Sequence, residues 1–215
     1  MNMAPPEVVA GGKLFALSPA QSTVRIYAFR AGKAARFGHN HVLAAPQFKG
    51  YFYLSPDGAG ASRFALEFRL DQLQLDNADQ RAAVGDSFAN PLSAEAIAST
   101  REHMLGEFNL QADQFPLVRI ASLEISGEAP KFAARVAVEL HGQIRSMWLP
   151  LTVRGLPQAL SAGGTILAEG ALVLRQSDFG IQPYSVLGGL LAVRDEVIVE
   201  FSLKTVSPTL PNAPP

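Results

Sequence analysis

The feature that most constrains the fold is an alternation of apolar and polar residues with a period of two. In residues 131–140 every even position is apolar, whereas Lys131, Arg135 and Glu139 occupy odd positions. Successive side chains of a strand point to opposite faces, so this pattern is typical of a strand with one buried face. The same alternation predicts eight strands in all, at residues 23–28, 48–54, 64–75, 117–126, 132–140, 147–153, 166–174 and 197–203.

Eight one-sided strands predict a barrel. Most of the connections between them are short and carry Gly, Pro, Asp or Ser, as hairpins require. Closure into a barrel hides the strand edges, so we expect an all-β fold, an eight-stranded antiparallel up-and-down barrel. A closed sandwich is the alternative. In one strand the apolar phase shifts from Leu70 to Leu73 and Leu75, which indicates a bulge or a bend.

One stretch, residues 76–114, lacks the alternation and carries helix-forming residues instead. Ser93 can cap a helix that runs toward Leu105, and Gly106 is a suitable stop. A shorter helix is expected over residues 79–84. The sequence therefore predicts one helical insertion in the barrel, at about 76–114.

The composition favours a single barrel domain over residues 14–206, with a flexible N-terminal tail (1–13) and a Pro-rich C-terminal tail (207–215). Hydrophobic residues make up 48% of the 215 residues and charged residues 17%, which excludes disorder for most of the chain. The absence of cysteine excludes disulfide scaffolds, thiol catalysis and zinc fingers. With 18 basic and 19 acidic residues, the chain has no electrostatic signature of nucleic-acid binding, and no window is long enough to span a membrane.

An eight-stranded barrel either is filled by its own side chains or holds one small ligand. Several inward positions carry small residues that would leave volume: Ala28, Gly50, Ala134, Ala168 and Gly170. Large neighbouring side chains could occupy the same space. The residues alone therefore leave a cavity and a filled core equally open.

Few residues could carry chemistry. In an extended segment His39 and His41 would point to one side and could chelate a transition metal, with His103 of the helical insertion as a third ligand. The favoured alternative is that the pair packs and bonds to backbone at a turn. His141 follows Glu139 and is expected to be structural. No spacing nominates a catalytic residue, and no cofactor motif occurs, so none is expected.

The order of several short motifs resembles the YceI-like family of lipocalin-like barrel proteins. Residues 175–181, Arg-Gln-Ser-Asp-Phe-Gly-Ile, are similar to the Arg-x-x-Asp-Phe-Gly-Ile turn of that family. The resemblance covers roughly residues 18–206. Further matching segments, in chain order, are Gly38–His41, typical of one branch of the family, Phe48–Gly50, Met104–Leu105 with Gln114–Pro116, Leu140–Gly142 and Asp195–Val197.

The resemblance implies a barrel with an elongated apolar cavity, and a non-enzymatic protein that binds or carries a long apolar molecule of the polyisoprenoid or fatty-acyl type. A head group would lie at the barrel mouth, near His39, His41 and His103. The second hypothesis is a metal-binding protein or metal-dependent hydrolase that uses the His39/His41 pair. The expected cavity-lining residues are Phe48, Phe52, Phe64, Leu66, Phe68, Val136, Leu172, Val199 and Phe201.

The expected partner is thus an apolar, lipid-like small molecule, with no nucleic acid and no membrane span. Whether the barrel forms a homodimer is left open. The family resemblance implies a periplasmic location. The segment Met1 to Leu17 lacks a basic region followed by an apolar run, so the sequence as written predicts no signal peptide and a cytoplasmic location.

Overall fold

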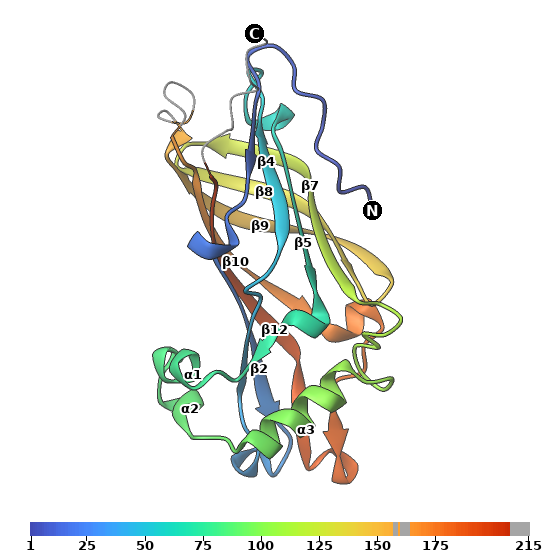
Figure 1. Cartoon of the computed structure of the whole chain (residues 1–215). Helices are drawn as coiled ribbons and strands as arrows, with labels where there is room; N and C mark the ends of the chain where they lie inside the picture. Colours follow the sequence, from blue (N-terminus) through green and yellow to red (C-terminus); the bar gives the residue numbers. More distant parts are fainter. Residues whose placement is uncertain (157–158, 160–163, 207–215) are drawn as a thin grey trace.

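The computed structural model describes residues 1–156, 159 and 164–206 (Figure 1). It shows an elongated antiparallel sheet, with the helices gathered at one end. Residues 1–12 contain no helix or strand, and the Met1 ammonium lies 3.2 Å from a carboxylate oxygen of Glu139. The expected C-terminal tail, 207–215, lies outside the described residues.

The described residues form twelve strands, and every pair of neighbours is antiparallel. Their order across the sheet is β1-β4-β5-β7-β8-β9-β10-β12-β2-β3-β6, and β11 pairs with β12. The bounds are β1 Lys13–Ala16, β2 Thr23–Ala31, β3 His41–Ala44, β4 Lys49–Leu54, β5 Arg63–Arg69, β6 Gln74–Leu75, β7 Leu117–Glu128, β8 Lys131–Leu140, β9 Gln143–Arg154, β10 Leu167–Arg175, β11 Ser185–Val186 and β12 Leu191–Lys204.

The expected count of eight strands is therefore wrong: η4 divides the expected strand 64–75 into β5 and β6, and the short strands β1, β3 and β11 were not expected. The 3₁₀ turn η1 (Pro19–Gln21) separates β1 from β2, and η4 (Leu70–Gln72) separates β5 from β6. Residues 45–48 separate β3 from β4. At each interruption the chain changes partner: β1 pairs with β4, whereas β2 pairs with β3 and β12. The bend predicted after Leu70 is confirmed at η4.

The sheet also differs from the expected closed up-and-down barrel, because it stays open. Within the described residues the path of paired strands ends at β1 and β6, and no ladder joins these two strands. A single bridge between Leu17 and Thr205 ties the β1 end to the end of β12, flanked by the hydrogen bond from Ser18 N to Lys204 O at 2.8 Å. The result is a strongly curved, half-barrel-like sheet. Two of its strands, β1 and β6, have only four and two residues, too few to form a long closing ladder.

The helical insertion is confirmed. It contains α1 (Ala78–Val84), α2 (Asp86–Ala89) and α3 (Ala94–Leu105). Ser93 caps α3 by accepting from Ala96 N at 3.2 Å, as its position predicts. In Figure 1 these helices lie at the end of the sheet formed by β2 and the first part of β12. The remaining 3₁₀ turns are η2 Ala35–Phe37, η3 Ala59–Ala61, η5 Gln176–Phe179 and η6 Leu187–Gly189.

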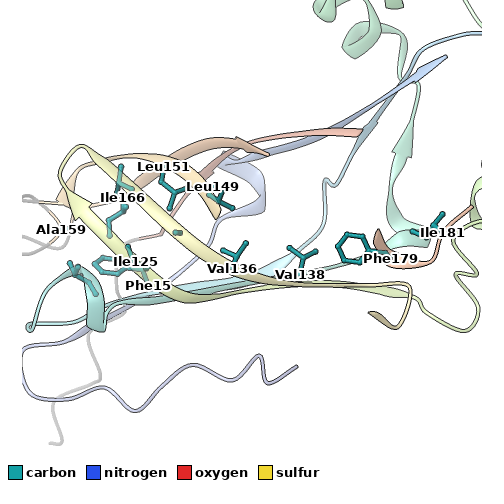
Figure 2. Packing of buried hydrophobic residues seen from close by; sticks show 13 residues of the cluster. Phe15, Ile125, Val136, Val138, Leu149, Leu151, Ala159, Ile166, Phe179 and Ile181 are labelled. Carbon is teal, nitrogen blue, oxygen red and sulfur yellow. The ribbon is translucent and has the colours of Figure 1, made fainter. Parts of the chain in front are cut away.

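The core follows the inner face of the curved sheet. One buried cluster extends from Ile166, near one end, to Phe179 and Ile181 near the other, with Val136 and Val138 between them (Figure 2). Phe179 belongs to η5 and is completely buried, and the next residue, Gly180, adopts the left-handed conformation at φ 71°. The Asp-Phe-Gly tripeptide is thus a turn, as its context predicts, whose aromatic ring contributes to the core.

Candidate functional site

The inner face of the sheet encloses a cavity of about 600 Å³, a volume typical of small-molecule sites. Its lining is mostly aliphatic and aromatic. Register partners on neighbouring strands share a face, and one row across five strands lies entirely on the cavity wall. From β10 to β6 the row is Leu172, Val199, Ile26, Leu43 and Leu75.

The structure brings eight of the nine expected lining residues to this cavity: Phe52, Phe64, Leu66, Phe68, Val136, Leu172, Val199 and Phe201. Phe48 is the exception. It lies in the interruption before β4, is 8% exposed, and packs in a buried cluster with Val24, Leu43 and Leu66 rather than on the cavity wall.

The small inward residues contribute unequally to the cavity. Ala28 and Ala168 line it. A Cβ atom placed on Gly170 would lie 2.6 Å from Cζ of Phe201, and one placed on Gly50 would lie 2.7 Å from a neighbouring side chain. Neighbouring side chains therefore fill the space beside these two glycines, and the glycines add no volume to the cavity.

A buried polar cluster lies at β3, where His41 is part of the cavity wall. His41 is opposite Ala28 in the sheet, Ala28 is opposite Val197, and all three residues line the cavity. The imidazole is thus on the inner face. Its Nδ1 atom lies 2.6 Å from Oδ2 of Asp76, whose side chain is fully buried.

Asp76 is held from several sides. Its Oδ1 atom accepts hydrogen bonds from Val42 N at 3.0 Å and from Arg81 Nη1 at 2.5 Å. Arg81, itself 3% exposed, also donates to Asn40 O at 2.7 Å and to Asn90 O at 3.2 Å. Asp76 adopts a positive φ of 53°, a conformation that aspartate tolerates better than most residues. We call His41, Asp76 and Arg81 the β3 polar cluster.

The electrostatics of the cluster fix the proton on His41. Burial acts to raise the pKa of Asp76, but the hydrogen bond and charge of His41, together with the bonds from Val42 and Arg81, outweigh it and lower this pKa. An ionised carboxylate only accepts hydrogen bonds, so Nδ1 of His41 carries the proton that lies between the two groups. Among the described residues nothing hydrogen-bonds the other ring nitrogen, Nε2.

Comparison with known families matches residues 15–205 to the model of the YceI-like domain. The chain belongs to the YceI-like family. Among solved structures, it is similar to BcnA of Burkholderia cenocepacia, with 16% identity, a TM-score of 0.62, and coverage of 87% of this chain and 98% of that chain. The YceI protein of Campylobacter jejuni is a weaker match, with 8% identity, a TM-score of 0.48, and coverage of 65% and 70%. No curated protein matches.

The candidate metal-binding group of His39, His41 and His103 is not found among the described residues of this YceI-like protein. The described residues contain no group of three histidine, aspartate or glutamate side chains that could hold a metal ion. Because β3 begins at His41, His39 lies outside the strand, is exposed and does not line the cavity. Partial burial and the positive charges of His41, Arg81 and Arg30 lower the pKa of His39.

The other two histidines have separate positions. His103, on α3, lines the cavity and is exposed, and its ring packs beside Tyr184 with centroids 5.3 Å apart. His141 lies in the turn between β8 and β9, where its Nδ1 is 3.0 Å from Phe179 O and its ring meets Phe115 edge-on. The structural role expected of His141 agrees with these contacts.

Sequence reasoning missed Asp76 and Arg81. Asp76 is 35 residues from His41 and reaches it only because β6, just before it, pairs with β3. The one local signal is Asn77, which caps α1 by accepting from Asp79 N and Gln80 N, and so fixes where the helix that carries Arg81 begins. That signal predicts a helix start and says nothing about the partner of Asp76.

Proposed function

We propose that this YceI-like protein binds a long apolar small molecule, of the fatty-acyl or polyisoprenoid type, inside the cavity and without catalysing a reaction. The observation that carries the proposal is the apolar cavity of about 600 Å³. Membership of a family known for lipid- and polyisoprenoid-binding barrels supports it.

Desolvation supplies the binding free energy. Each buried CH₂ contributes about 0.8 kcal/mol, so ten of them contribute about 8 kcal/mol. Before the cost of association is subtracted, about 8 kcal/mol corresponds to a dissociation constant near 1 μM. Chains of more than about ten carbons are therefore the expected ligands. The row from Leu172 to Leu75 offers such a chain continuous apolar contact across five strands.

The family resemblance also supports a periplasmic location. Over the residues that the structure describes, no helix is both long enough and apolar enough to cross a bilayer.

The test uses two neighbouring residues of β10 that face opposite sides of the sheet. Leu172 lines the cavity, whereas Val173 is 58% exposed on the outer face. Leu172→Trp places an indole in the cavity, and Val173→Trp is the matched control. Titration with cis-parinaric acid, an 18-carbon acid that fluoresces in apolar surroundings, measures the dissociation constant of each protein.

We expect the wild-type protein to bind the probe, Leu172→Trp to weaken binding at least about tenfold, and Val173→Trp to leave it within about twofold. Thermal melts followed by circular dichroism show that both variants are folded. A wild-type protein that binds no probe, or equal losses in the two variants, would refute binding inside the cavity.

A further inference from the structure

On β3 the mostly apolar wall of the cavity carries an imidazole among aliphatic side chains. One step along β3 from the row that contains Leu43 and Ile26, the next inward residue is His41, with Ala28 beside it. The small side chain of Ala28 leaves room next to the imidazole ring. A ligand bound against Leu43 and Ile26 therefore has the imidazole of His41 beside it, two residues along β3.

The β3 polar cluster orients this imidazole. Asp76 accepts the Nδ1 proton across 2.6 Å and is itself paired with Arg81. The charges of Asp76 and Arg81 cancel each other, so the cluster is neutral when the imidazole is neutral. Nε2 then presents a lone pair on the inner face, and protonation of Nε2 creates a positive charge that Asp76 stabilises through Nδ1.

We propose that the ligand carries a carboxylic acid at one end and that His41 binds it as an imidazolium–carboxylate pair through Nε2. This inference rests on the proposed function and names the ligand class: a long-chain monocarboxylic acid. The O–H bond of the neutral acid breaks and an N–H bond forms at Nε2. When the acid arrives as a carboxylate, the proton comes from water. Asp76 stays ionised and is a positioning residue.

An acid suits the cluster better than an alcohol or an ester. An alcohol can donate one neutral hydrogen bond to Nε2, and an ester cannot donate at all. The acid forms a charge-assisted hydrogen bond, which is roughly twice as strong as a neutral one. It also leaves the site with two positive and two negative charges, counting Asp76 and Arg81, so that no charge is buried without a partner. On α3, Ser99 and Thr100 add hydroxyl groups to the cavity lining.

The test compares cis-parinaric acid with its methyl ester, which has the same chain and no acidic proton. Dissociation constants are measured for the wild-type protein, for His41→Gln and for His39→Gln. His41→Gln removes the ionisable ring from the cavity. His39→Gln is the matched control, because His39 is two residues away, exposed and outside the cavity lining. Asp76→Asn, a further variant, keeps a hydrogen-bonding side chain and removes the negative charge.

We expect the wild-type protein and His39→Gln to bind the acid about tenfold or more tightly than the ester, which is about 1.4 kcal/mol for a factor of ten. In His41→Gln the two probes should bind equally, with the affinity for the ester retained, which shows that the cavity is intact. Asp76→Asn should also reduce the preference for the acid.

The contrary outcomes are distinguishable. Equal binding of acid and ester by the wild-type protein, or a preference for the acid that survives in His41→Gln, refutes the role of His41 and leaves the apolar-ligand function standing. Binding of neither probe by the wild-type protein refutes the proposed function itself, and this inference with it.

Discussion

Replacing Arg81 by methionine should destabilise the protein strongly, because it leaves a buried carboxylate without its cation. The side chains of Asp76 and Arg81 are 0% and 4% exposed. Removing one partner of such a pair costs about 3–5 kcal/mol. The buried acceptor Asn40 O also loses a hydrogen bond, which adds about 1 kcal/mol. Asn90 is exposed, and water replaces its bond.

The expected loss is thus about 4–6 kcal/mol, compared with a total of about 5–15 kcal/mol for a typical domain. For a domain of this size each kcal/mol lowers Tm by about 2–4 °C, so a shift on the order of 10–20 °C follows. Urea denaturation and thermal melts followed by circular dichroism measure both quantities. Arg69→Met is the control, because Arg69 makes a similar pair with Asp71 at 2.9 Å in an exposed position. Its effect should be several times smaller.

A double-mutant cycle isolates the charge. In Arg81→Met combined with Asp76→Asn the unpaired carboxylate is gone, so the double variant should lose less stability than the sum of the two single variants, by more than about 1 kcal/mol. Additive losses, or an Arg81→Met variant within about 1 kcal/mol of the wild type, would contradict the assignment of a buried ion pair.

Two further predictions follow from the same geometry. The pKa of Asp76 lies below its ordinary value of 3.8, so the stability that the carboxylate contributes is present above that pH and is lost as the pH falls through the folded-state pKa. In urea denaturation, the difference in free energy of unfolding between the wild type and Asp76→Asn should therefore shrink below about pH 4. A difference that stays constant from about pH 6 to pH 2.5 would oppose this. Gly170→Ala places a Cβ atom 2.6 Å from Cζ of Phe201 and 2.7 Å from Pro150 O, so it should lower the free energy of unfolding by about 1–3 kcal/mol, measured by thermal or urea unfolding. Gly60→Ala, whose Cβ atom would have no neighbour closer than 3.9 Å, should lower it less. Equal losses of stability in the two variants would count against the close approach at Gly170.

The parts of the fold that the sequence predicts well are those determined by local pattern. The alternation over residues 131–140 matches β8, Lys131–Leu140. Ser93 predicts the start of α3, because a cap depends on residues within one turn. The strand interruptions are different. At η1 the chain passes from β1, which pairs with β4, to β2, which pairs with β12. Apart from Pro19, no residue of this segment specifies the change of partner. The four-residue β1 is also too short to show alternation.

For the candidate site, the sequence indicates an apolar lining but misses the cluster that gives it polarity. Val136 and Phe201 line the cavity because strand alternation alone places them on the inner face. The candidate metal pair of His41 with His39 assumes that both residues lie in one extended segment. The strand begins two residues too late for that, and the partner of His41 is Asp76, brought near by pairing of β3 with β6. Such a contact depends on register between distant segments.

The pairing of β12 with β2 has a consequence for the newly made protein. These strands join Thr23 to Ser202 and Ala31 to Ala192, so one edge of β2 has no partner until β12 has left the ribosome. At about 5–20 residues per second, synthesis from Ala31 to Lys204 takes roughly 10–35 s. During that time β2 exposes unpaired backbone and apolar side chains, which is the condition under which strands associate with the wrong chain. The last long strand of the sheet therefore completes the pairing of one of the first.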